Sequence, residues 1–73
     1  MNDRIAIDPK ICHGRPIIKG TRVPATIVVG SVASGMSFEQ IEYEYGLIAD
    51  DIRAALQCAN ALVERETSHP LSQ

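Results

Sequence analysis

The chain has 73 residues, 45% of them hydrophobic, and a formal net charge of −2 at pH 7. This composition excludes a wholly disordered chain and a general attraction to nucleic acid, and a single domain of this length has a small core that usually needs added support from a second copy or a partner. No apolar run approaches the roughly 20 residues of a membrane span, and the charged N-terminus lacks the hydrophobic stretch of a signal peptide, so we expect a cytoplasmic protein that does not enter membranes.

The first 22 residues predict a ribbon of two short strands. Residues 4–7 alternate weakly in hydropathy, residues 16–18 form an apolar run, and residues 8–15 join them. A two-stranded ribbon is marginal alone, so we expect it to pack on the helices that follow or to pair with the strands of a second chain.

The segment Gly14–Pro24 combines three cations with two prolines and two glycines. Proline suits a strand start at Pro16, and at Pro24 it suits a turn or the first position of a helix. Around Gly20, backbone N–H groups, a hydroxyl and two cations could converge on a carboxylate of a partner or on a phosphate, although a solvated turn is the alternative. The residues predicted to bind a partner are Arg15, Lys19, Thr21 and Arg22.

Two short helices are predicted next. Apolar residues at three-and-four spacing predict a helix over residues 24–34, which Gly35 ends, while the β-branched run at residues 27–29 favours a strand as the alternative. Ser37 and Gln40 form the signature of a capping box, with Met36 and Ile41 placed as a hydrophobic staple. This second helix is expected to end at Gly46, to bury Phe38, Ile41 and Tyr45, and to face Glu39, Glu42 and Tyr43 outward.

A third and longest helix is expected from about Asp50 to Glu66. Asp50 and Asp51 favour the positive end of its dipole. The residues expected to line its inward face are Ile52, Leu56, Ala59, Leu62 and Val63. The fold class is therefore mainly α, with short N-terminal strands before a three-helix bundle of helix-turn-helix type. We expect one domain over residues 1–66, divided into an arm (1–22) and a body (23–66), and a flexible tail over residues 67–73.

The spacing of the last two predicted helices resembles a DNA-binding helix-turn-helix, with Ile41 and Ile52 meeting in the angle between them. The residues that would read base edges are Arg53, Gln57 and Asn60. Asp50 and Asp51 at the helix entry would repel phosphate, so a helix-turn-helix used only as a packing scaffold is an equal alternative.

The sequence contains no convincing catalytic or metal-binding constellation. Consecutive aspartates lie about 100° apart on a helix and cannot share one metal ion on one face. The spacing of Cys12, His13, Cys58 and His69 does not match a zinc site, and we expect plain thiols. We therefore predict a protein that is not an enzyme, with no cofactor and no metal.

The charges divide unequally between the two halves of the chain. Residues 1–36 carry five cations and two carboxylates, a net +3, whereas residues 37–73 carry two arginines and seven carboxylates, a net −5. This asymmetry, unless it arises by chance, suits a protein that docks on a copy of itself or shows opposite faces to two partners, and we expect a homodimer.

Over nearly its whole length the chain resembles the small bacterial family known as domain of unknown function 433. The segments that carry the resemblance are Ile7-Asp8-Pro9, the segment from Gly14 to Pro24 with its Lys-Gly-Thr-Arg centre, residues 35–41 and residues 50–56. The resemblance implies a helix-turn-helix type domain with N-terminal strands, acting as the antitoxin partner of a PIN-like ribonuclease toxin.

Two positions depart from the family pattern. Ile48 stands where relatives carry a threonine or serine cap, so the third helix is expected to start later, with Asp50 as its cap. His13 stands where a glycine is common, so a side chain occupies a position where the loop backbone could have used positive φ.

Two functions are consistent with these features. The first is an antitoxin-like protein that neutralises a PIN-like ribonuclease and represses its own operon by binding operator DNA. In that case either an acidic surface covers the cations of the nuclease, or Lys19 and Arg22 reach its catalytic carboxylates. The residues of this acidic surface are Glu39, Glu42, Glu44, Asp50 and Asp51. The alternative is a stand-alone helix-turn-helix transcriptional regulator.

Overall fold

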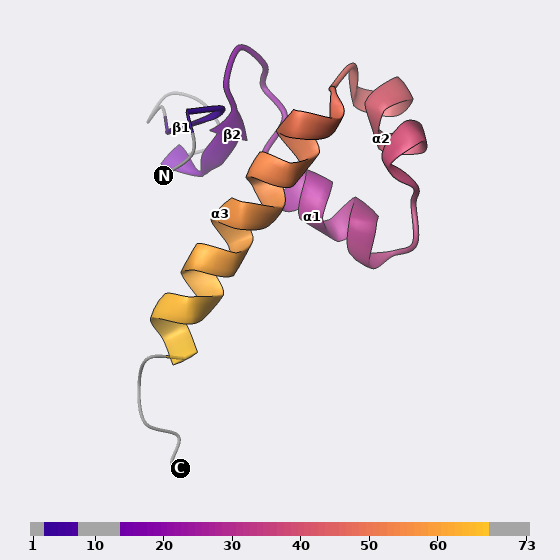
Figure 1. Ribbon diagram of the computed structural model, residues 1–73. Coiled ribbons are helices and arrows are strands. Elements are labelled where there is room, and N and C mark those ends of the chain that lie inside the picture. Colours follow the sequence, from indigo (N-terminus) through magenta and orange to yellow (C-terminus); the bar gives the residue numbers. More distant parts are fainter. Residues whose placement is uncertain (1–2, 8–13, 68–73) are drawn as a thin grey trace.

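The computed structural model describes residues 3–7 and 14–67, which form two strands and three helices. In chain order these are β1 (Ile5–Ile7), β2 (Pro16–Ile18), α1 (Ala25–Ala33), α2 (Phe38–Tyr45) and α3 (Ala49–Thr67). The two strands and α2 lie on opposite sides of the N-terminal half of α3, and α1 packs against that same half (Figure 1). The predicted mainly α fold with an N-terminal ribbon is confirmed.

The two strands form an antiparallel pair. Ile5 pairs with Ile18, and Ile7 pairs with Pro16, which stands at the strand start as its ring requires. On the other side of β2, an isolated bridge joins Ile17 to Pro24. Ile17 and Ile18 are buried, so the ribbon packs on the body of the same chain. The connection at residues 8–13 lies outside the described residues.

Residues 27–29 are helical, so the strand alternative for this segment was wrong. Pro24 is the N-cap of α1, one position before the predicted one. At the other end, Met36 N–H donates to the Ser31 carbonyl and Gly35 N–H donates to the Val32 carbonyl, with Gly35 at φ 99°. These two bonds are a Schellman motif, and they confirm Gly35 as the end of the helix.

The capping box of α2 is formed as predicted. Gln40 N–H donates to Ser37 Oγ over 3.1 Å, and Ser37 N–H donates to Gln40 Oε1 over 2.8 Å. Gly46 ends α2 in the left-handed conformation, at φ 68°. Of the residues expected to face inward, Ile41 is fully buried, whereas Phe38 and Tyr45 are half-buried.

α3 begins at Ala49, so the expectation that Asp50 caps this helix was wrong. The Ile48 carbonyl accepts the first helical hydrogen bonds, which places Ile48 at the N-cap. Ile48 N–H donates to Asp51 Oδ2 over 3.2 Å, which is one half of a capping box. The other half is missing because isoleucine has no side-chain acceptor. Thr67 ends the helix, one residue beyond the prediction, and residues 68–73 lie outside the described part.

We expect Ile48→Ser to raise the melting temperature by several degrees. A serine hydroxyl would complete the capping box with Asp51, which contributes about 1 kcal/mol, or roughly 4–8 °C in a domain of this size. Little burial is lost, since Ile48 is 52% exposed. Ile48→Ala removes the same side chain without adding an acceptor, and thermal melts that place Ile48→Ser no higher than this control would contradict the cap.

The core lies where α1, α2, α3 and β2 meet. Its largest fully buried side chains are Ile18, Val28, Ile41 and Ile52. The predicted contact across the turn between α2 and α3 is consistent with this packing, because Ile41 and Ile52 belong to the same buried cluster. None of the helices in the described residues has both the length and the apolar character needed to cross a membrane.

Candidate partner-binding surfaces

The turn between β2 and α1 is held by hydrogen bonds within its own residues. Thr21 N–H donates to the Ile18 carbonyl over 3.0 Å, and Ile18 N–H donates to the Val23 carbonyl over 2.9 Å. Gly20 adopts φ 81°, the conformation that glycine favours at the third position of a type II turn. The turn is therefore preorganised, and the chain presents its flanking side chains from a fixed backbone.

Thr21 has a structural role in this turn. Its hydroxyl donates to the Ile18 carbonyl over 2.7 Å and accepts from Val23 N–H over 3.0 Å. Both of these bonds stay within the turn and help to set its shape. Among the predicted partner-binding residues, Thr21 therefore shapes the turn that positions its neighbours.

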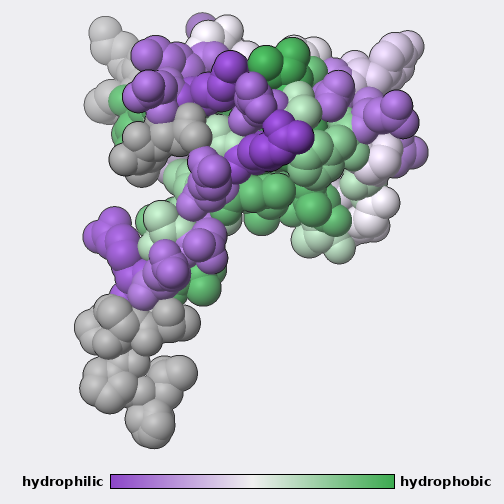
Figure 2. Space-filling model, in the orientation of Figure 1, coloured by the Kyte–Doolittle hydropathy of each residue, from purple (hydrophilic) through white to green (hydrophobic). Residues whose placement is uncertain are grey.

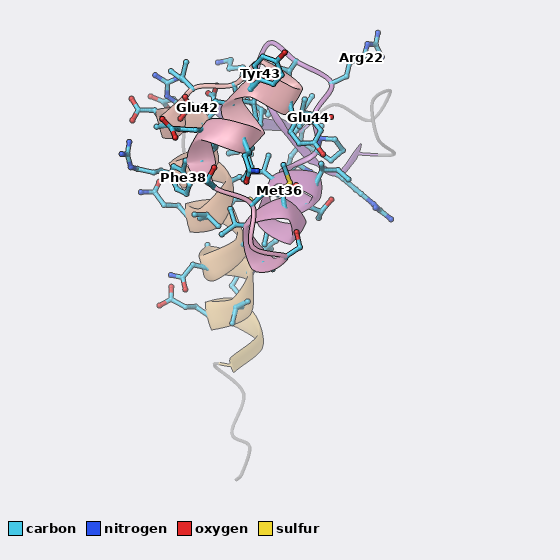
Figure 3. All side chains as sticks on the ribbon, turned by 90° about the vertical axis from the view of Figure 1, so that its right-hand side faces the viewer. Arg22, Met36, Phe38, Glu42, Tyr43 and Glu44 are labelled. Atoms are coloured by element: carbon cyan, nitrogen blue, oxygen red, sulfur yellow. The ribbon has the colours of Figure 1, made fainter. Side chains whose placement is uncertain are left out.

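The three predicted cationic contacts do not form one cluster. Lys19 and Arg22 are exposed on either side of Gly20-Thr21, and Arg22 extends outward from the turn (Figure 3). Arg15 is also exposed but precedes β2, whereas Lys19 follows it. Four residues of extended chain separate their backbones by about 13 Å. We call Lys19 and Arg22 the basic turn.

Charges of opposite sign meet at the N-terminus of α3. Arg4, which precedes β1, places Nη1 at 3.1 Å from Asp51 Oδ1 and Nη2 at 3.7 Å from Asp50 Oδ2. Arg53 Nη1 lies 2.8 Å from Asp50 Oδ1. The basic N-terminal half and the acidic C-terminal half of the chain are therefore partly paired with each other, because Arg4 binds the two aspartates that were expected to repel phosphate.

The predicted base-reading residues share one exposed face of α3. Arg53, Gln57 and Asn60 are all exposed and follow at four- and three-residue spacing, which places them on one side of the helix. Arg53 is tied to Asp50, however, so its guanidinium is held toward the helix start. This ion pair competes with the base contact predicted for Arg53.

α2 presents an acidic outer surface. Glu39 and Glu44 are exposed, Glu42 is half-buried, and Tyr43 is 91% exposed and points away from the body (Figure 3). The helix contains no basic residue. The predicted outward face of α2 is confirmed for Glu39 and Tyr43.

The described residues include no cluster of three or more His, Cys, Asp or Glu side chains suited to a metal ion. Cys58 is a buried free thiol on α3. Cys12, His13 and His69, which were considered with it as metal ligands, lie outside the described residues.

Sequence reasoning missed the role of Arg4. It counted Arg4 only as one charge of the basic half, but its partners are 46 and 47 residues away in the chain. No local pattern signals such a contact, and only the register of the ribbon against α3 brings the groups together.

A family model described as "Protein of unknown function (DUF433)" matches residues 5–59. The chain is also 30% identical over 57 residues to a Mycobacterium tuberculosis (strain ATCC 25618 / H37Rv) protein named "Putative antitoxin VapB45". That alignment covers 78% of this chain and 24% of the relative, so the chain spans about a quarter of its length.

A solved structure has the same fold. The crystal structure of a DUF433 member protein from Anabaena variabilis ATCC 29413 aligns with a TM-score of 0.75 and 28% sequence identity. The alignment covers 93% of this chain and 71% of the crystallised one. The two proteins therefore share one fold over most of this chain.

Proposed function

This chain belongs to the DUF433 family of proteins of unknown function, and from this membership we propose that it is an antitoxin-like protein that binds and neutralises a PIN-like ribonuclease toxin, acting as a homodimer. The observation that carries the proposal is the 30% identity to a protein named as an antitoxin, over 78% of this chain. The matched region includes most of the folded body, so the proposal concerns this domain and not the remainder of the longer relative.

The basic turn is the proposed contact with the nuclease. A nuclease that cleaves RNA through bound metal ions holds those ions with carboxylates, and the planar fork of an arginine meets a carboxylate in a bidentate way. The preorganised backbone around Gly20 supports this role, because a fixed turn loses little conformational freedom on binding.

The acidic surface is the weaker candidate for this contact. Of the five acidic residues that could cover cations of the nuclease, Asp50 and Asp51 are already paired with Arg4. The proposal also includes repression of the operon by the complex, in which Arg53, Gln57 and Asn60 would contact the operator DNA.

Co-expression with the product of the adjacent gene tests this function. We expect the two proteins to elute together in size-exclusion chromatography, and RNA cleavage by the purified nuclease to stop when this chain is added in equal amount. A nuclease that cleaves RNA equally well with and without the chain would refute neutralisation.

A second candidate is a stand-alone transcriptional regulator, favoured by the common exposed face of Arg53, Gln57 and Asn60. A regulator should bind its own upstream DNA without the nuclease, with an affinity that falls steeply as salt rises. A bare antitoxin should bind that DNA weakly until the nuclease is added. Titrations of labelled DNA at two salt concentrations, with and without nuclease, separate the two.

A further inference from the structure

α1 is uncharged and apolar around most of its circumference. Its sequence, ATIVVGSVA, has no charged residue, yet only Ala25, Val28 and Ser31 are buried within the chain. Ile27 is 43% exposed. A helix that is hydrophobic on all sides is usually buried on all sides, so the isolated chain leaves α1 incompletely covered.

α3 continues its apolar stripe beyond the part of the helix that the body covers. Ile52 and Ala55 are fully buried, but Leu62 is 44% exposed and Val63 is 56% exposed, although both were expected to face inward. The last turns of α3 project past α1 and the ribbon (Figure 1), and residues 60–65 are all exposed. Figure 2 shows hydrophobic (green) residues gathered over the middle of this face of the molecule, below a band of hydrophilic (purple) residues.

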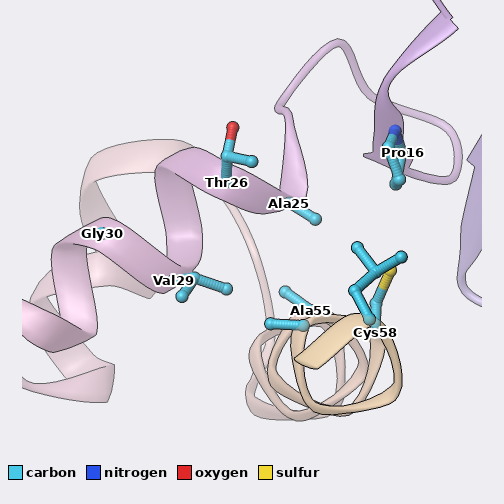
Figure 4. Close-up of a pocket in the computed structure, with 9 residues that line it drawn as sticks. Pro16, Ala25, Thr26, Val29, Gly30, Ala55 and Cys58 are labelled. Atoms are coloured by element: carbon cyan, nitrogen blue, oxygen red, sulfur yellow. The ribbon is translucent and has the colours of Figure 1, made fainter. Parts of the chain in front are cut away.

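These two surfaces meet in an apolar groove of about 280 Å³. Pro16 of β2, Ala25 and Val29 of α1, and Ala55 and Cys58 of α3 surround it (Figure 4). Its remaining lining residues are Thr26, Gly30, Ala59 and Leu62. None of these described lining residues carries a charge.

Within the described part of the chain, no contact requires a glycine at position 30. Glycine is unfavourable inside a helix relative to alanine, and it is normally retained where another group approaches closely. A Cβ atom built on Gly30 would meet nothing within 4 Å. The space above Gly30 is therefore open in this chain.

We propose that the occupant of this groove is a second copy of the chain, whose projecting α3 inserts Leu62 beside Gly30 while the first copy does the same in return. The groove and the projecting side chains belong to the same molecule, which is the condition for a two-fold interface in which each copy offers the same patch. Because none of its described lining residues is charged, the apolar stripe of a helix suits the groove better than a nucleic acid or a charged peptide.

The size of the patch suits a weak dimer. α1, with nine residues, is about 14 Å long, α3, with 19 residues, is about 28 Å long, and each helix is about 10 Å wide. A strip along both helices therefore covers at most roughly 420 Å² per copy, or about 840 Å² in total, which lies in the range below about 1,200 Å² that weak complexes bury. The inference rests on the homodimer of the proposed function. Its test uses the chain without nuclease, so the dimer interface can be refuted while neutralisation of the nuclease stands, and the reverse.

Sedimentation velocity of the full chain tests the interface. We expect the wild type to be a dimer, and Leu62→Glu and Gly30→Lys each to raise the dimer dissociation constant at least about tenfold while circular dichroism stays helical. Tyr43→Glu, which places the same charge on an exposed residue of α2, should leave the dimer intact.

Mixing the two groove variants tests the contact directly. In a mixed dimer, a lysine at position 30 faces a glutamate at position 62 at one end, and the native pair remains at the other. We therefore expect the mixture to dimerise more tightly than either variant does alone. A monomeric wild type, a dimer that both variants leave unchanged, or a mixture that stays monomeric would each overturn the interface. Groove variants that lose only nuclease binding would assign the groove to the nuclease instead.

Discussion

Replacing Ile52 by alanine is expected to remove about 3 kcal/mol of folding stability, within the 2–5 kcal/mol usual for a buried isoleucine. Ile52 is fully buried on α3 in the cluster that also contains Ile41 and Ile18, so the lost methyl groups leave a cavity among α2, α3 and the ribbon. At about 0.05–0.15 kcal/mol per residue, a domain of this length has a total stability of roughly 4–11 kcal/mol. This single substitution therefore removes a large share of the total.

Urea denaturation followed by circular dichroism measures this effect. The matched control is Ile48→Ala, which removes the same atoms at the N-cap of the same helix, where Ile48 is 52% exposed, and it should cost less than about 1 kcal/mol. Protein concentration must be equal in all samples, because association of two copies raises the apparent stability. Equal urea midpoints for the two variants would show that burial of Ile52 does not stabilise the fold.

The double variant Lys19→Ala, Arg22→Ala is expected to weaken binding to the nuclease at least about 100-fold. Hydrogen bonds to charged groups contribute about 1.5–3 kcal/mol each, and two of them together account for a factor of this size. Both side chains lie on the exposed turn outside the core, so the helices should remain folded. Isothermal titration of the nuclease with the variant measures the loss.

A second double variant controls for net charge. Arg53→Ala, Arg65→Ala also removes two cations, but from α3. It should bind the nuclease with nearly wild-type affinity if the basic turn makes the contact. An equal loss for the two double variants would show that overall charge, and not the basic turn, governs binding.

The ends of the helices were predictable because their signals are local. Ser37 and Gln40 are three residues apart and bond to each other, and Gly35 and Gly46 adopt the positive φ values that end α1 and α2. The start of α3 was predicted one residue late. Sequence reasoning expected a side-chain cap, whereas Asp51 bonds to the backbone of Ile48 from inside the helix.

The candidate surfaces were predictable in part. The sequence identified the cations of the basic turn, but it assigned Thr21 to the partner although its hydroxyl bonds within the turn. It also expected Leu62 and Val63 to be covered, because periodicity reports which residues share a face of a helix and not whether another element reaches that face.

The sequence by itself determined the order and type of the elements, their glycine and serine boundaries, and the mainly α class, since each depends on residues within a few positions of one another. Only the tertiary structure decided that Arg4 pairs with Asp50 and Asp51, and that α1 and α3 leave an apolar groove open. Contacts between the ribbon and α3, and between α1 and α3, depend on how whole elements pack, and this packing has no signature in local spacing.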